Sequence, residues 1–180
     1  MCSDTKGRIA EAVEEMMLTK PVSKITIGSI MEQTQMKRQT FYYHYQDIYG
    51  VLEWIVECEL CIPLRYDETV DPGEWCMDAL NLLRAKQPLL RQLSPALGRE
   101  KLYQLTGGIL RPQLSRYLPI SQEQDPENFE LALDMLCYAV FCTLDSLVVS
   151  RTPLNVDACA KYLRALFSTM QRAGEWAAVP

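Results

Sequence analysis

Residues 24–54, KITIGSIMEQTQMKRQTFYYHYQDIYGVLEW, constrain the fold most, because several short helical signals follow one another without a gap. Thr26 suits an N-cap, and the apolar residues after it recur at i, i+3 and i+4, which predicts a helix over residues 27–34. A short turn leads to a second helix over residues 38–45, and an apolar third helix is expected from residue 49 to about residue 60. Since three such helices can bury one small core, the stretch predicts a helix-turn-helix.

The second of these helices has two chemically different faces. Phe41 and Tyr45 lie one turn apart and are expected to point inward, whereas the opposite face is polar and begins with a cation. Such a face suits the major groove of DNA, where Arg reads guanine and Gln reads adenine. An aromatic helix that is partly buried and has no partner is the alternative. The expected DNA contacts are Thr26, donating to a phosphate, and Lys37, Arg38, Gln39, Thr40, Tyr42, Tyr43 and His44.

The motifs Thr26-Ile27 and Thr40-Phe41-Tyr42-Tyr43-His44-Tyr45 resemble the DNA-binding domain of TetR-type transcription regulators. The string RQTFYYHYQD is similar, more narrowly, to the branch that regulates dihydroxyacetone kinase operons. The resemblance implies an all-α fold with a helix-turn-helix domain over residues 1–48 and an effector-sensing and dimerisation domain over residues 49–180. It also implies a homodimer on a palindromic operator, controlled by a small-molecule effector or by a coactivator protein.

Two positions depart from the family pattern. Gln35 stands in the turn where the family usually has Gly, and a left-handed backbone there would cost about 1 kcal/mol. Ile48 stands where the family commonly has a phosphate-binding Lys. These departures favour an alternative function, a helical protein-interaction module that has lost DNA binding.

The charge distribution and the cysteine content limit the class of protein. The formal net charge is −5, yet residues 20–50 sum to +2, so the cations are concentrated at the proposed DNA face. Lys6 and Arg8, near the start of the first helix, either extend that face or form a solvated end. Seven scattered cysteines predict reduced thiols and a cytoplasmic location. Cys58 and Cys61 form a lone C-x-x-C with one His in the chain, so neither zinc nor another metal is expected.

The C-terminal part contains two long apolar helices, expected over residues 126–151 and 155–173. The first is apolar nearly all round, and the resemblance implies that both pair with their symmetry mates; a buried hairpin is the alternative. Asp134 and Asp145 argue against a membrane span, and each needs a partner such as an Arg.

A small-molecule pocket in the body is the last expectation. Its walls are predicted to be apolar or amphipathic, although apolar and aromatic residues at helical spacing also form an ordinary hydrophobic core. The chain shows none of the local motifs of phosphate-binding loops, dinucleotide sites or serine hydrolases, so neither an enzyme nor a cofactor is expected. The predicted pocket residues are Trp75, Leu82, Leu102, Tyr103, Leu110, Met135 and Tyr138.

Overall fold

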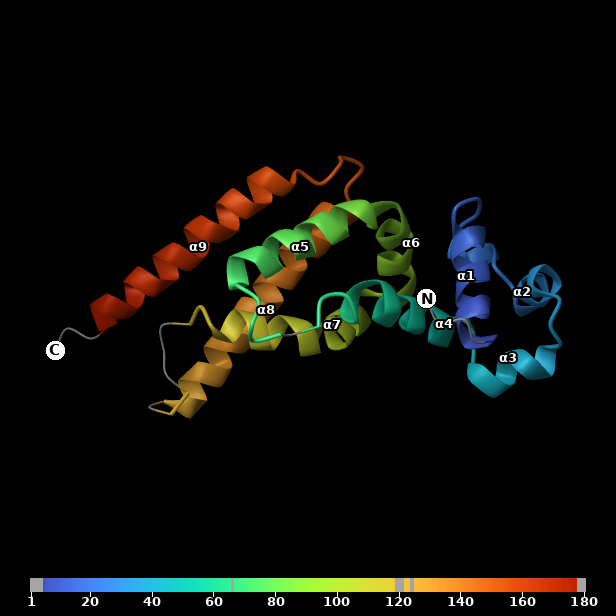
Figure 1. The fold of residues 1–180 in the computed structure, drawn as a ribbon, viewed down its shortest axis with the longest axis horizontal. Helices are drawn as coiled ribbons and strands as arrows, with labels where there is room; N and C mark the ends of the chain where they lie inside the picture. Colours follow the sequence, from blue (N-terminus) through green and yellow to red (C-terminus); the bar gives the residue numbers. More distant parts are fainter. Residues whose placement is uncertain (1–4, 66, 119–121, 124, 178–180) are drawn as a thin grey trace.

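A computed structural model describes residues 5–65, 67–118, 122–123 and 125–177, with the side chains of residue 72 and of residues 170–177 left out. Every regular element in these ranges is helical, which confirms the expected all-α fold (Figure 1). The elements in chain order are α1 (Thr5–Met17), η1 (Val22–Lys24), α2 (Ile27–Thr34), α3 (Arg38–His44), α4 (Ile48–Val56), η2 (Glu57–Cys61), α5 (Pro72–Ala85), α6 (Gln87–Leu97), α7 (Arg99–Ser115), α8 (Pro126–Val149) and α9 (Val156–Ala177).

Side-chain caps begin several of the helices, and the one at Thr26 confirms the cap expected from the sequence. The Thr26 hydroxyl accepts from the Ser29 amide at 3.1 Å, and the Ser29 hydroxyl in turn accepts from the Thr26 amide at 3.2 Å. Asp71 accepts from two amides at the start of α5, and Asp125 accepts from the Asn128 amide ahead of α8. These caps satisfy backbone N–H groups that the first turn of a helix leaves without partners.

The first four helices form one end of the molecule (Figure 1). α1 packs against α2 and α4, and α2 packs against α3, around the fully buried side chains of Ile9, Ile30, Phe41 and Leu52. α1, η1 and α4 also contact α6, so a single cluster of buried residues continues into the rest of the chain. The division into domains at residues 48 and 49 therefore stays a prediction.

The segment expected to be helical from residue 49 to about residue 60 is helical over residues 48–61, and its hydrogen-bonding pattern changes within it. α4 ends at Val56, and η2 continues it as a π-helix, with the Ile62 amide donating to the Glu57 carbonyl at 2.8 Å. A π-turn is wider than an α-turn, and such turns recur at functional positions. η2 packs against α7 in the body.

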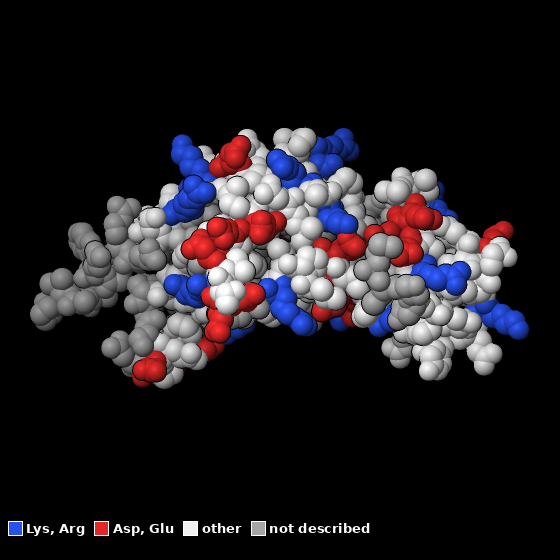
Figure 2. Space-filling model, viewed as in Figure 1, with Lys and Arg blue, Asp and Glu red and all other residues white. Residues whose placement is uncertain are grey.

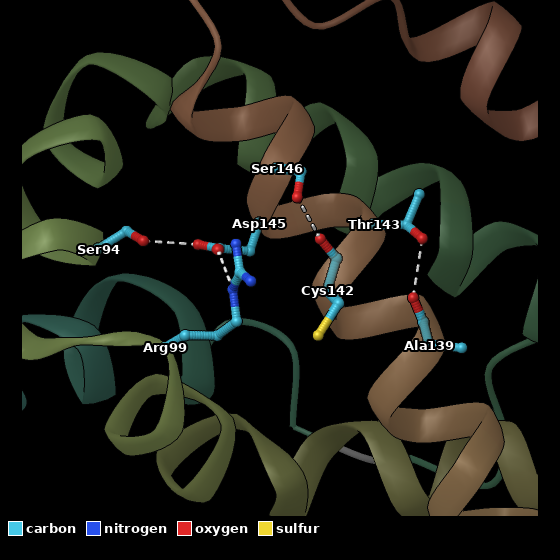
Figure 3. Close-up of polar contacts among 7 residues, drawn as sticks. All are labelled: Ser94, Arg99, Ala139, Cys142, Thr143, Asp145 and Ser146. Carbon is cyan, nitrogen blue, oxygen red and sulfur yellow. Dashed lines mark hydrogen bonds and ion pairs between the residues drawn. The ribbon is translucent and has the colours of Figure 1, made fainter.

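α8 packs against α6 and α7, whereas α9 packs against α5 and diverges from α8 toward its end (Figure 1). By length and composition α8 resembles a membrane span, but it carries three acidic side chains that are paired within the protein. Arg111 pairs with Glu130 and Asp134, and Arg99 pairs with Asp145, whose carboxylate also accepts from Ser94 at 2.6 Å (Figure 3). The predicted need of Asp134 and Asp145 for partners is thus confirmed.

Candidate functional site

α3 separates buried aromatic side chains from exposed ones. Phe41 is fully buried and Tyr45 is 5% exposed, whereas Tyr42 is 57% exposed and Tyr43 is 84% exposed. The outward face of α3 therefore consists of side chains that the rest of this chain leaves uncovered. Of the predicted DNA contacts, Thr40 and His44 are half-buried, and the exposed ones are Thr26, Lys37, Arg38, Gln39, Tyr42 and Tyr43.

The turn between α2 and α3 keeps the left-handed geometry despite its glutamine. Gln35 has φ 57° and ψ 33°, and its side-chain amide donates to the Glu32 carbonyl at 2.8 Å. The Met36 amide donates to the Met31 carbonyl at 3.1 Å, which closes the end of α2. Gln35 therefore adopts the left-handed conformation at the cost of strain, and α3 packs beside α2.

A cation and a hydroxyl come together at the start of α2. The Arg38 Nη2 and Thr26 Oγ1 atoms each lie 3.7 Å from the point that a Cβ on Gly28 would occupy. A glycine at this position leaves that space open. Because the first amides of a helix attract anions, this corner of the site combines three features that suit a phosphate group.

The inner end of α3 is held by a cation that the sequence does not assign to the core. The Tyr45 hydroxyl donates to the Lys6 carbonyl at 2.9 Å, and the Lys6 ammonium lies 3.6 Å from the centre of the Trp54 ring. Arg8 donates to the Thr34 carbonyl at 3.4 Å. Both cations thus make internal contacts, and Lys6 ties α1 to α3 and α4. Local sequence cannot reveal this role, since the partners are far apart in the chain.

The start of α4 differs from the family pattern in the structure as in the sequence. Asp47 caps the helix by accepting from the Gly50 amide at 2.9 Å, and Ile48, the first helical residue, is half-buried. Figure 2 shows Lys and Arg side chains at the outer edge of the helix-turn-helix end, Asp and Glu side chains elsewhere on that end, and charges of both signs over the middle of the molecule. The exposed cations at this end of the molecule include Lys37 and Arg38 at the start of α3, Lys24 just before Thr26, and Arg8 of α1.

A second feature is a cavity of about 110 Å³ in the body, lined by residues of α5 to α9 and of η2. Of the seven predicted pocket residues, Trp75, Leu102 and Leu110 line it. The other four, Leu82, Tyr103, Met135 and Tyr138, do not line this cavity, and their part in a ligand pocket stays a prediction. Met135 and Tyr138 lie on the face of α8 that points away from the body, at 67% and 47% exposed, and the Tyr103 ring packs edge-on against the Tyr138 ring. Apolar character along a helix does not show which face turns inward.

The cavity also contains a residue that the sequence analysis misses. Gln113 of α7 is 1% exposed, and neither its amide oxygen nor its amide nitrogen has a hydrogen-bond partner. A buried amide without partners is unusual, because the group loses its hydration without compensation.

The C-x-x-C pair lies in η2, where Cys61 is buried and Cys58 is half-buried. The Cys61 thiol donates to the Leu105 carbonyl at 3.5 Å, and burial raises its pKa to about 12. A thiol with so high a pKa is a poor nucleophile. Among the residues that the structure describes, no three His, Cys, Asp or Glu side chains gather as metal ligands would.

Comparisons with known proteins identify the fold of this chain. The structure superposes on the dihydroxyacetone kinase operon activator DhaS with a TM-score of 0.66 and 14% identity, covering 94% of this chain and 97% of that one. It matches a TetR transcriptional regulator from Streptococcus agalactiae 2603V with a TM-score of 0.66, 22% identity and 93% of each chain covered. This chain has the TetR fold.

Two further relatives extend the comparison. The TetR family repressor AlkX from Dietzia sp. strain DQ12-45-1b, implicated in biodegradation of n-alkanes, matches with a TM-score of 0.57 and 17% identity over 94% of this chain and 97% of that one. In sequence, the chain is 30% identical over 80 residues to the HTH-type dhaKLM operon transcriptional activator DhaS of Lactococcus lactis subsp. lactis (strain IL1403). That match covers 44% of this chain and 42% of the relative. No family model matches the chain.

Proposed function

We propose that this chain is a cytoplasmic transcription regulator of the TetR type, which binds a palindromic operator as a homodimer through α3. The observation that carries the proposal is the outward face of α3, where Arg38, Gln39 and Tyr43 stay exposed while Phe41 anchors the helix in the core. Similarity to proteins named as TetR-type regulators supports it. Arg38 and Gln39 would read bases, since their planar groups match the edges of guanine and adenine.

Phosphate contacts would hold α3 in register. Lys37 precedes the helix and is exposed, and Tyr42, Tyr43, Thr40 and His44 supply hydroxyl and ring N–H groups along it. Thr26 and the start of α2 would meet the backbone on the other side, with the Arg38 guanidinium close by. Without a Lys at Ile48, the interface has one backbone contact fewer than the family pattern.

A homodimer is supported by apolar side chains that the single chain leaves exposed on its two last helices. On α8, Leu131, Met135 and Tyr138 follow helical spacing and are 59%, 67% and 47% exposed. On α9, Tyr162 and Leu166 are one turn apart and are 74% and 44% exposed. Large contiguous apolar patches mark interfaces, and two reading helices about 34 Å apart would meet successive major grooves.

Control of DNA binding would pass through α4. This helix begins directly after α3, and its continuation η2 brings Leu60 to the wall of the cavity. A small-molecule effector in the cavity, or a coactivator protein on the body, would shift the balance between arrangements with different distances between the two α3 helices.

The test is selection of bound sites from a pool of random DNA duplexes, followed by affinity measurements against salt concentration. A palindromic consensus is expected, with a steep fall of affinity as salt rises. Arg38→Ala should lower the affinity for the selected site by roughly 5- to 150-fold. It should also relax the base preference at one base pair of each half-site. Lys37→Ala should instead reduce the magnitude of the slope of log affinity against log salt concentration by about 1, because one phosphate contact is lost.

Arg151→Ala is the matched control, because Arg151 is exposed and lies beyond α8, away from α3. Its DNA affinity should equal that of the unmodified chain. If no sequence is enriched and affinity is independent of Arg38, the protein-interaction module becomes the better account.

A further inference from the structure

The body cavity has a lining with almost no polar surface. Its walls are mainly aliphatic and aromatic side chains, and its volume of about 110 Å³ is comparable with the roughly 150 Å³ apolar cavities that bind a single aromatic ring. Size and lining together suit a small ring compound rather than a sugar, a nucleotide or a peptide. They do not by themselves say what polar group, if any, the compound carries.

Gln113 supplies that information. Its side chain is 1% exposed and lines the cavity from α7, and both of its amide atoms lack a hydrogen-bond partner. The hydroxyls of Ser94 and Thr106, which also line the cavity, are already used within the protein. Ser94 donates to Asp145 at 2.6 Å (Figure 3), and Thr106 donates to the Leu102 carbonyl at 2.9 Å. One donor and one acceptor, side by side on Gln113, thus stay available to a ligand.

The charges around the cavity exclude an ionised ligand. The described lining contains neither Lys nor Arg, so an anion would lose its hydration without gaining a counter-charge. Its carboxylate, Asp145, is paired with Arg99 at 3.0 Å, and burial raises the pKa of the Cys76 thiol, which keeps that group neutral. Among the lining residues described, there is therefore no unpaired negative charge that could bind a cationic ligand.

We propose that the cavity binds a neutral, ring-sized apolar molecule that carries one amide-like group, and that this group forms a pair of hydrogen bonds with the amide of Gln113. An amide is the complement of an amide, because each offers a donor and an acceptor at the same spacing. Binding does not rest on the proposed function. Its use as a signal does, because Leu60 and Leu64 at the cavity wall lead back through η2 to α4.

The experiment measures binding of three ring compounds to the full chain by isothermal titration calorimetry, without DNA. Benzamide is neutral and carries the complementary group, toluene lacks it, and benzoate is an anion of the same shape. We expect benzamide to bind at least about tenfold more tightly than toluene, since it satisfies a buried polar pair, and benzoate to bind more weakly than either.

Two variants test the part assigned to Gln113. Gln113→Leu should bind benzamide no better than toluene, and without ligand its Tm should rise by about 2 to 4 °C, because an unpaired buried amide is removed. Thr106→Val is the matched control, since that hydroxyl lines the same cavity but is already bonded to Leu102. It should keep the preference for benzamide.

Three results would each overturn the proposal. They are no binding of benzamide, an unchanged preference for benzamide in Gln113→Leu, and a lower Tm of that variant, which would show that the amide is paired in the protein itself. Because no DNA is present, failure of the operator test would leave this result standing, and the reverse also holds.

Discussion

The two ends of the molecule both leave side chains uncovered, but the chemistry of those side chains is opposite. At one end α3 exposes Arg38, Gln39 and Tyr43, whose charge, amide and hydroxyl suit a hydrated, anionic partner. At the other end α8 exposes Leu131 and Met135, which gain only from being removed from water. An exposed helix face thus indicates a partner, and its side chains indicate which kind.

The same contrast exists within α3 between its two faces. Both are aromatic, but only the inner one is tied to the core, through Phe41 and through the Tyr45 hydroxyl bound to the Lys6 carbonyl. Aromatic content alone therefore does not distinguish an anchor from a contact residue, whereas burial does.

The largest expected effect separates these two faces of α3. Phe41→Ala should lower the free energy of unfolding by about 3 to 5 kcal/mol, because it leaves a cavity in the core between α1, α2 and α4. Tyr43→Ala should change it by less than about 0.5 kcal/mol and weaken DNA binding instead. Urea unfolding followed by circular dichroism, with DNA affinity measured in parallel, checks both. Equal losses of stability in Phe41→Ala and Tyr43→Ala would contradict the division of α3 into a buried face and an exposed face.

The next effect tests the apolar end. Met135→Glu should weaken self-association by at least about 30-fold, because a carboxylate would be buried in the interface between copies without a partner. Sedimentation equilibrium measures it, and DNA affinity should fall with it. Leu18→Glu is the matched control, since Leu18 is 79% exposed and lies outside α8 and α9. Identical behaviour of the two variants would remove the argument for this interface.

A smaller effect concerns the carboxyl of Glu14 on α1. Burial raises its pKa to about 7, with Glu59 adding to the rise and Lys86 opposing it. The folded chain holds this proton more tightly than the unfolded chain, so the ionised carboxyl costs stability above about pH 7. That cost fades as the pH falls toward the ordinary value of 4.5.

Glu14→Gln removes this titration while it keeps the shape of the side chain. It should stabilise the protein by roughly 1 kcal/mol at about pH 8, a value reduced for the partial exposure of the group, and by nothing near pH 4. Thermal unfolding as a function of pH measures the difference.

The smallest effect sharpens the account of the turn between α2 and α3. Gln35→Gly should stabilise the protein by roughly 0.5 kcal/mol, because relief of the left-handed strain exceeds the loss of the exposed hydrogen bond to Glu32. DNA affinity should not fall, since the path of the turn is unchanged. A destabilised variant would show that the glutamine side chain holds the turn.

Local signals were sufficient for much of this protein. The caps at Thr26, Asp71 and Asp125, the apolar spacing of the helices and the two faces of α3 depend on residues within about one turn of each other, so the sequence alone determined the all-α fold and the position of α3. Tertiary structure decided the rest. Which face of α8 turns outward, that Lys6 packs on Trp54, and that Gln113 lies unpaired beside a cavity all depend on side chains brought together from distant parts of the chain. Such contacts have no period and no fixed spacing, so only packing determines them.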